Sequence, residues 1–338
     1  MRRFDHAPPM TDGSRPRVEI ESAPDADRID VRVDGLPFTH YVYREDIPDL
    51  TKPVLYPIRT AKGAEITRGY PLDPRPEDRR DHPHHVGLWF TYGNVDGIDF
   101  WNLSSRVPAE RRDEYGTIHH RAVERTTSGF GRGELAVSMD WVGPDGRTVL
   151  EQETTFVVFA TSDERAIDHV TTLRAGDRPV RLHDDKEGLL CVRLRRELEH
   201  PAEETVAGPA EEADADVEPT GVFLSSEGDR GTDVWGTRAR WVRLTGRIGG
   251  EPVTVAMFDH PENVGYPTHW VARGYGPFGP NPIAPSVFSG DPPMNFELAA
   301  DEATTFRYRI AIKTGDIDAA ELDDRQAAFA EGSPPDHS

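Results

Sequence analysis

Apolar and polar residues alternate along most of this chain, and this alternation constrains the fold more than any other feature. In the segment 28–35, Ile29, Val31 and Val33 lie on one side of an extended chain and charged residues lie on the other. Successive side chains of a strand point to opposite faces, so the alternation predicts a strand with one buried face. The strand signal recurs in further segments, at 17–22, 133–143, 154–160, 166–173, 188–194, 240–248, 253–259 and 305–313.

Residues that favour turns separate these predicted strands. Glycine and proline at 142–147, 175–179 and 247–252 are typical of hairpin connections. Many half-buried strands with few helices predict an all-β fold, a large antiparallel β-sandwich. Only the C-terminal segment 317–332 is typical of a helix.

The pattern is that of one domain. Strand signals continue on both sides of the segment 199–221, which is rich in Ala, Glu, Asp and Pro and has no strong periodicity. We therefore expect a single β-sandwich domain over 16–330, with a flexible acidic loop at 199–221. Residues 1–15 and 331–338 are expected to be disordered.

The charge of the chain excludes several classes of partner. The 338 residues include 60 acidic and 39 basic ones, for a formal net charge of −21. A charge of this sign repels phosphate groups, so we expect neither nucleic acid nor a membrane as a partner. No run approaches the roughly 18 apolar residues that cross a bilayer, and no apolar segment follows the first basic residues. We expect a cytoplasmic protein with a small-molecule ligand, and the sequence leaves self-association open.

Two residue types are scarce. Cys191 is the single cysteine, which excludes a disulfide framework and a cysteine-rich metal site. Its apolar surroundings at 188–194 predict a small core residue rather than a nucleophile. The chain has only four lysines, at positions 52, 62, 186 and 313.

Three histidines lie close together at the start of an apolar run, in "DHPHHVGLWF" at 81–90. In an extended chain His82 and His84 would share a side, and Pro83 predicts that they lie at the mouth of a strand. With a third ligand from another strand, His82 and His84 are the best candidates for a divalent metal site. Acid/base catalysis or hydrogen bonding to a substrate by His82, His84 and His85 is the alternative that we favour. No cofactor is predicted.

A second polar group lies at 183–188, "HDDKEG", between two predicted strands. Asp185 or Glu187 could be a catalytic carboxylate whose pKa is set by Lys186 and a neighbouring acid. The rarity of lysine gives Lys186 additional weight. A solvated charged turn is the alternative.

The segment 258–285 is rich in Pro, Gly and aromatic residues, as binding loops often are. Its aromatic residues could stack on a sugar ring, or they could close one end of the sandwich. The candidates for stacking are Trp270, Tyr275 and Phe278, and those for hydrogen bonding are Arg273, His269 and Asn281.

Taken together, four pieces of sequence resemble DUF6807, a bacterial family of unknown function whose members are often labelled methane oxygenase PmoA. The pieces are "DHPHHVGLWF…GNVDGIDFW", "DKEG", "WGTRARW" and "FDHPENVGYPTHW…RGYGPFGPNP". A methane monooxygenase subunit is a membrane protein, and this chain has no spanning segment, so that label does not fit. The residues that match the motifs are His82, His84, His85, Asp185, Lys186, Glu187, Trp235, His260, His269 and Asn281.

The resemblance implies a β-sandwich of the galactose-mutarotase-like kind and a carbohydrate context. We therefore expect a sugar-active isomerase, epimerase or lyase, with the matching histidines and carboxylates as catalytic groups. Trp235, Trp270, Arg273, Tyr275 and Asn281 would bind the substrate. A carbohydrate-binding or sensing protein without activity, and a metal-dependent hydrolase or oxygenase, are the alternatives. The expectation requires that 82–85, 185–187 and 260–269 meet at one site.

Overall fold

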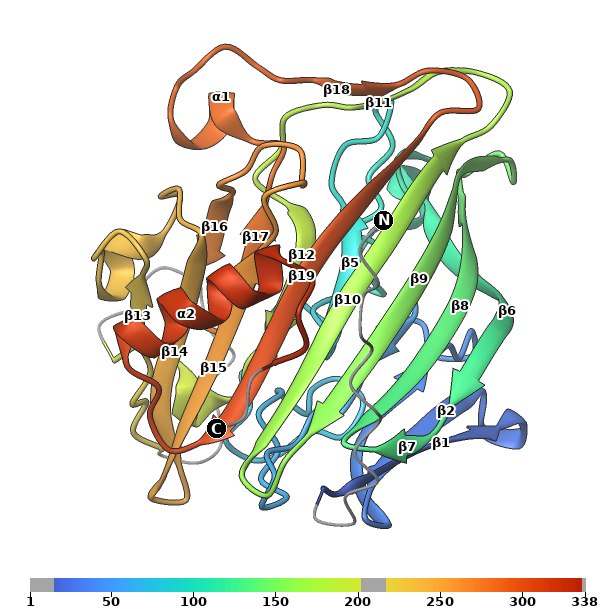
Figure 1. Ribbon diagram of the computed structural model, residues 1–338. Coiled ribbons are helices and arrows are strands. Elements are labelled where there is room, and N and C mark those ends of the chain that lie inside the picture. Colours follow the sequence, from blue (N-terminus) through green and yellow to red (C-terminus); the bar gives the residue numbers. More distant parts are fainter. Residues whose placement is uncertain (1–14, 202–216, 336–338) are drawn as a thin grey trace, which may run out of the picture.

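The computed structural model describes residues 15–201 and 217–335, and it consists mainly of two large sheets packed face to face (Figure 1). The nine-stranded sheet has the order β16 (His269–Ala272), β17 (Pro277–Asn281), β12 (Gly188–Arg193), β5 (Leu88–Tyr92), β4 (Val54–Leu55), β3 (Leu36–Val42), β2 (Arg28–Val33), β1 (Arg17–Ala23) and β7 (Gly129–Phe130). The eight-stranded sheet has the order β13 (Val222–Ser225), β14 (Trp241–Ile248), β15 (Glu251–Asp259), β19 (Ala303–Thr314), β10 (Glu164–Ala175), β9 (Thr148–Ala160), β8 (Arg132–Val142) and β6 (Thr117–Thr127). All neighbouring strands are antiparallel, so the predicted all-β sandwich is confirmed.

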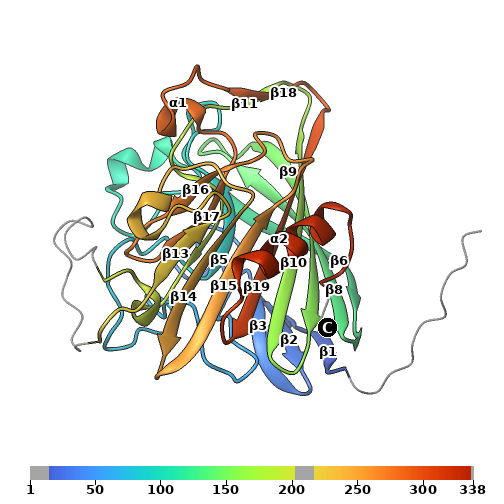
Figure 2. The same cartoon turned by 60° about the vertical axis from the view of Figure 1, so that its left-hand side comes forward.

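The remaining elements are short. A two-stranded sheet pairs β11 (Val180–Leu182) with β18 (Phe296–Leu298), and Figure 2 shows it beside α1 (Pro285–Phe288) at one end of the sandwich. The predicted C-terminal helix is α2 (Ala319–Ala330), which begins after Asp318, whose carboxylate accepts a hydrogen bond from the Glu321 amide. Short 3-10 helices occur at Pro24–Ala26, Ala109–Glu114, Arg196–Leu198 and Gly231–Val234.

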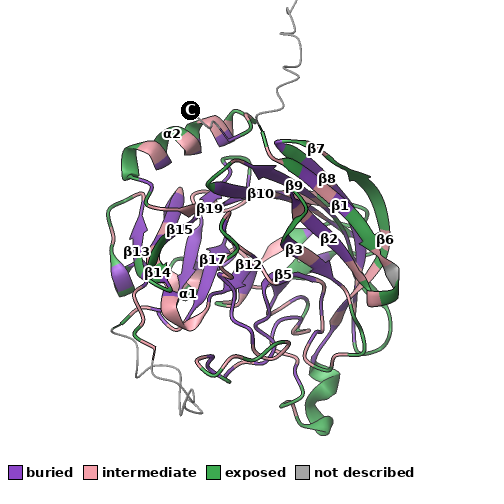
Figure 3. Ribbon diagram, turned by 90° about the horizontal axis from the view of Figure 1, so that it is seen from below, coloured by how far each residue is buried: buried purple, intermediate pink, exposed green. Residues whose placement is uncertain are grey.

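The main core lies between the two sheets, and the alternation seen in the sequence forms it. Along β15, Val255 and Met257 point into this core, while Ala256 and Phe258 point outward and are covered by α2. Figure 3 shows α2 on the outer side of the eight-stranded sheet. A strand that is buried on both faces explains the unbroken apolar run Val255–Phe258 within β15.

The nine-stranded sheet is also buried on both faces at β5 and β12 (Figure 3). Leu88 and Phe90 belong to the main core, whereas Trp89 belongs to a second apolar cluster together with Cys191 and Val271. Alternate residues of a strand point to opposite faces, so this second cluster lies on the side of the sheet that faces away from the core. We call that side the outer face. Cys191 is fully buried there, as expected for a core residue.

Two of the three predicted hairpins are confirmed. The turns at 142–147 and 247–252 join β8 to β9 and β14 to β15. In the second turn Gly249 and Gly250 have φ values of 57° and 85°, the left-handed backbone that a two-residue hairpin requires. The third prediction is wrong, because β10 and β11, on either side of 175–179, pair with different strands.

Several predictions concern residues outside the described part of the chain. The predicted N-terminal tail lies there except for residue 15, as do 202–216 of the acidic loop and 336–338 of the C-terminal tail. Glu199, at the start of the acidic loop, is buried and accepts hydrogen bonds from Arg79 and Arg196. Among the described residues, no helix is long and apolar enough to cross a membrane.

Candidate functional site

The histidine motif forms a tight turn that leads into β5. The amide of His85 donates a hydrogen bond to the carbonyl of His82 at 3.0 Å, and His82 has a φ of 40°. The prediction of an extended chain with His82 and His84 on one side is therefore wrong, because Pro83 lies inside a turn. The expected position at the mouth of a strand is correct, since β5 begins at Leu88.

The rings of the three histidines pack on one another over the outer face. His82 and His85 are stacked with centroids 4.8 Å apart, and His84 meets the His85 ring edge-on at 4.4 Å. His85 in turn stacks on Trp89 at 5.2 Å. The turn is thus fixed to β5 by aromatic contacts as well as by its backbone.

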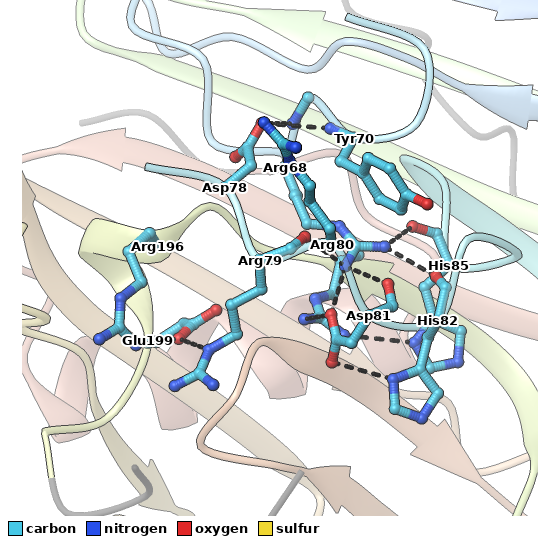
Figure 4. A network of polar contacts seen from close by, with 12 residues as sticks. Arg68, Tyr70, Asp78, Arg79, Arg80, Asp81, His82, His85, Arg196 and Glu199 are labelled. Carbon is cyan, nitrogen blue, oxygen red and sulfur yellow. Dashed lines mark hydrogen bonds and ion pairs between the residues drawn. The ribbon is translucent and has the colours of Figure 1, made fainter. Parts of the chain in front are cut away.

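Asp81 anchors the turn through a buried ionic cluster (Figure 4). Its carboxylate accepts hydrogen bonds from Arg68 Nη1 at 2.6 Å, from Arg193 Nη2 at 2.7 Å and from His82 Nδ1 at 2.9 Å. Burial alone would raise the pKa of Asp81, but the charge of Arg193, the hydrogen bond with His82 and the charge of Arg68 hold it well below its usual range. Arg68 also donates to the carbonyls of His82 and His85, so the cluster determines the backbone of the turn.

Both ring nitrogens of His85 face protein neighbours. The indole N–H of Trp101 donates to its Nε2 at 3.2 Å, and Arg193 Nη1 faces its Nδ1 at 3.4 Å. Both neighbours are donors only, so a doubly protonated ring would meet a donor at each nitrogen. Burial and the nearby positive charges hold the pKa of His85 well below its usual range, and the ring is neutral.

His84 differs from its neighbours because its ring has no partner. The side chain is buried, yet neither Nδ1 nor Nε2 has a hydrogen-bond partner among the described residues. Burial and the positive charge of Lys52 hold the pKa of His84 well below its usual range. A neutral imidazole offers one donor and one acceptor, which matches a hydroxyl group. Buried polar atoms without a partner are rare in folded proteins and often mark a functional group.

Lys52 lies beside His84 and is buried as well, with an exposed fraction of 3%. Its ammonium donates to the carbonyl of His84 at 3.0 Å and lies 5.7 Å from the centroid of the Trp89 ring. Burial lowers the pKa of Lys52 to about 8, although the negative charges of Asp99 and Glu187 oppose this change. Lys52 therefore bonds the histidine turn and also lies within the field of Glu187, a carboxylate of the 183–188 loop.

The loop before β12 holds Glu187 against the same face. The Tyr92 hydroxyl accepts a hydrogen bond from the Asp185 amide, and Asn281 Nδ2 donates to the Asp185 carbonyl at 2.8 Å. Gly93 makes room for the loop, because a Cβ atom there would lie 3.0 Å from both Asp185 Cγ and Glu187 Cβ. Asn281 and Asp185 thus position the loop that presents Glu187.

Glu187 is the carboxylate with the most unusual surroundings in this loop. Its Oε2 is buried without a hydrogen-bond partner, and Lys186 Nζ lies 3.6 Å from its Oε1. Burial raises the pKa of Glu187, and the charges of Asp185 and Asp99 add to this effect, whereas the charge of Lys186 and a hydrogen bond with Asn102 oppose it. Lys186 itself is exposed and stands at the edge of the site. The environment favours a carboxyl group that exchanges protons at a higher pH than an ordinary glutamate does.

The predicted aromatic wall is only partly present. Tyr275 stacks on His82 with centroids 5.5 Å apart and lies under the guanidinium of Arg193. One face of Trp235 is covered by Arg273, whose guanidinium carbon is 3.4 Å from the ring centroid. The prediction for Trp270 is wrong, because this side chain is fully buried in the main core and donates to the Ala239 carbonyl. Phe278 is also part of that core.

The predicted convergence of the three segments on one site stays a prediction. The turn at 82–85 and the loop at 185–187 lie at opposite ends of the paired strands β5 and β12, and the charge of Glu187 acts on both Lys52 and Tyr275. His260 does not belong to this site, since its ring packs edge-on against Phe329 of α2 on the other sheet. His269 lies at the periphery, where its Nε2 bonds the Ser289 hydroxyl at 2.7 Å.

The described residues do not form a metal centre from protein ligands. No group of three His, Cys, Asp or Glu side chains within 15–201 and 217–335 is arranged to hold an ion. His82 already uses its Nδ1 to bond Asp81, and the rings of His82 and His84 meet edge-on at 5.7 Å. This arrangement does not fit the metal site in which His82 and His84 would act as paired ligands.

The family of the protein follows from comparison with known sequences. Residues 28–327 match a family of unknown function, DUF6807, and this match includes the histidine turn, the 183–188 loop and every strand of the two large sheets except β1. The chain belongs to the DUF6807 family. The resemblance inferred from the motifs is confirmed. No curated protein matches the chain at a significant level.

Several solved structures are similar to this DUF6807 chain at a low level. A GH36 α-galactosidase from Geobacillus stearothermophilus has 11% identity and a TM-score of 0.41, covering 88% of this chain and 41% of that one. A putative aldose 1-epimerase from Escherichia coli K12 has 11% identity and a TM-score of 0.37, covering 88% and 99%. The Slr1438 protein from Synechocystis sp. PCC 6803 has 12% identity and a TM-score of 0.33, covering 89% and 97%. The chain spans about two fifths of the galactosidase, and similarity at this level assigns neither a substrate nor a reaction.

Lys52 and Asp99 of this DUF6807 protein were not predicted at the site from the sequence. Lys52 precedes the histidine turn by some thirty residues, and only the rarity of lysine marks it. Asp99 lies in the stretch that follows β5. Its carboxylate accepts hydrogen bonds from the backbone amides of Trp101 and Asn102 at 2.7 and 2.9 Å. Asp99 thereby orients the indole that bonds His85.

The pKa of Lys52 predicts a particular pH dependence of stability. Between about pH 8 and 10.5 the unfolded chain retains a proton that the folded protein has released, so the free energy of unfolding rises with pH in this window. Relative to a Lys52→Met variant, the wild-type protein should gain about 1 kcal/mol per pH unit there. Urea unfolding of both proteins at several pH values measures this difference. A Lys62→Met variant, which changes an exposed lysine, should show a constant difference, and a constant difference for Lys52→Met would contradict the prediction.

Proposed function

We propose that this protein is an enzyme that transfers protons on a small hydroxylated carbonyl compound of the sugar type. The observation that supports the proposal best is a group of buried polar atoms without protein partners on the outer face. They are both ring nitrogens of His84, the indole nitrogen of Trp89 and Oε2 of Glu187. Leaving such groups unpaired costs about 1–3 kcal/mol each, which a polar ligand in this place would offset.

Glu187 is the group that moves the proton in this proposal. A general acid or base works best when its pKa lies close to the working pH, and the surroundings of Glu187 raise its pKa. Asp185, whose pKa is raised by burial, and Asp99 surround it with negative charge. Removal of a proton from a carbon next to a carbonyl group is the step that isomerases, epimerases and many lyases share.

The neighbouring groups suit the oxygen atoms of such a substrate. His84 can accept from one hydroxyl group and donate to another, the Trp89 indole can donate, and Lys52 retains donors beyond the one that bonds His84. The rings of Trp89 and Tyr275 supply the apolar surface on which the C–H groups of a sugar pack. A cytoplasmic location remains a prediction from the sequence.

Proton exchange in D₂O tests the proposal. The protein would be incubated with a panel of aldoses and ketoses, including uronic acids, and ¹H NMR would follow the proton on the carbon next to the carbonyl group. We expect at least one compound to lose this signal faster than it does without protein. A His260→Ala variant, altered on the other sheet, should exchange at the wild-type rate. Exchange at the background rate across the whole panel would contradict the proposal.

A further inference from the structure

Lys52 is held differently from the other buried cations near the site. Arg68 and Arg193 both bond the Asp81 carboxylate, and this pairing compensates their burial. Lys52 has no such partner: among the described residues no carboxylate lies within ion-pair distance, and its one hydrogen bond goes to the His84 carbonyl. A buried ammonium without a counterion is costly, so the deprotonated amine becomes accessible near neutral pH.

The surroundings of Lys52 are those of a reactive amine. Its nitrogen lies over the Trp89 ring, beside the unpartnered His84 ring, and the negative charge of Glu187 acts on it. Lys52 also lines a pocket of about 190 Å³ together with Tyr43, Leu103 and His120, and this pocket is distinct from the contacts that Lys52 makes with His84 and Trp89. Lysine becomes a nucleophile toward carbonyl compounds when it is desolvated in this way.

We propose that the Lys52 amine forms a covalent imine with the carbonyl carbon of an open-chain aldose, ketose or related keto compound. This inference rests on the proposed function of the same site, and it adds the substrate class and the covalent step. The reactive form of the substrate is the open chain, because a ring-closed sugar has no free carbonyl carbon.

Lys52 and Glu187 together would supply the nucleophile and the proton transfers of this step. The lone pair of Lys52 Nζ forms a bond to the carbonyl carbon, and the proton that the attacking nitrogen loses passes to the carbonyl oxygen to give a carbinolamine. Glu187 in its protonated form then donates a proton to the leaving hydroxyl group, so water departs and a C=N bond forms. The Glu187 carboxylate that results can remove the proton from the adjacent carbon, whose electrons the protonated imine accepts. Glu187 returns a proton to a carbon of the resulting enamine, which restores the protonated C=N bond. Water then adds to this bond and gives a proton to the Glu187 carboxylate, and cleavage of the C–N bond releases the product and the free Lys52 amine.

Reduction with borohydride tests the covalent step. Sodium borohydride converts an imine to a stable secondary amine, so the protein would be treated with dihydroxyacetone or glyceraldehyde and borohydride, digested and mapped by mass spectrometry. The four lysines of the chain and its N-terminal amine form an internal competition. Lys62 and Lys186 have side chains that are 57% and 58% exposed, so unspecific labelling would favour them.

We expect Lys52 to be labelled at least ten-fold more than Lys62 or Lys186 at low probe concentration. A Lys52→Arg variant, which retains the positive charge, should lose this adduct and keep the background at the other amines. If that variant does not fold, the distribution of label in the wild-type protein decides the question. Labelling that follows exposure and leaves Lys52 unmodified would overturn the inference.

The two proposals fail in different ways. Proton exchange that depends on Glu187, without any adduct at Lys52, would remove the covalent step and leave the proposed function in place. A specific adduct at Lys52 without exchange in any compound of the panel would support the reactive amine and contradict the proposed proton transfer.

Discussion

Replacement of Glu187 by glutamine should lower the rate of proton exchange by about 10²–10⁴-fold, the usual contribution of a general acid or base. The amide has nearly the same shape as the carboxylate, so the Asp185 and Gly93 contacts that position the loop should survive. Binding of the substrate should change much less than turnover. Exchange rates from NMR and the substrate affinity from calorimetry measure the two effects separately.

Lys186→Met is the matched control for Glu187→Gln. Lys186 lies 3.6 Å from the Glu187 carboxylate, but its own side chain is mostly exposed. Its positive charge lowers the pKa of Glu187, so its removal should raise that pKa and move the acidic limb of the pH–rate profile to higher pH. The maximal rate should stay within a few-fold of the wild-type value. A Glu187→Gln protein with the wild-type exchange rate would exclude Glu187 as the proton-transfer group.

The largest effect on stability is expected for Asp81→Asn. The change removes the charge that compensates Arg68 and Arg193, whose side chains are 1% and 0% exposed. Breaking a buried ion pair by removing one partner costs about 3–5 kcal/mol, because the other charge remains buried without compensation. We expect the midpoint of urea unfolding to fall accordingly, with an unchanged slope of the transition.

Glu297→Gln provides the comparison for Asp81→Asn. Glu297 forms an ion pair with Arg181, and both side chains are nearly half exposed. Water screens such a pair, so its loss should cost less than about 1 kcal/mol. Equal destabilisation by the two substitutions would show that the Asp81 cluster does not hold the histidine turn in the manner described.

The alternation of apolar and polar residues predicted the architecture because a period of two is visible within a single short segment of sequence. Ile29, Val31 and Val33 are buried in the main core, as expected. The same rule accounts for Trp89, which follows Leu88 and therefore lies on the other face. Sequence alone cannot show which outer face is covered by loops, because that depends on contacts between distant segments.

The residues of the candidate site were predicted only where they lie close together in the sequence. His84 and Glu187 were named because unusual residues lie close together in their motifs. Lys52 was not placed there, since its contact with His84 joins segments 32 positions apart. Trp270 was misassigned because the segment around it is rich in Pro and Gly and shows no alternation of apolar and polar residues. Only the pairing of β16 with β17 shows that its side chain points into the core.

The strand β5 has a consequence for how the protein would respond to heat. Its alternate residues belong to two compartments: Leu88 and Phe90 fill the interior, while Trp89 supports the histidine rings. Tyr92, at its end, places its ring in the interior and uses its hydroxyl to hold the Asp185 amide. Unfolding of the interior around β5 would therefore disrupt both the histidine turn and the 183–188 loop. We therefore expect the groups of the candidate site to unfold together with the scaffold rather than before it.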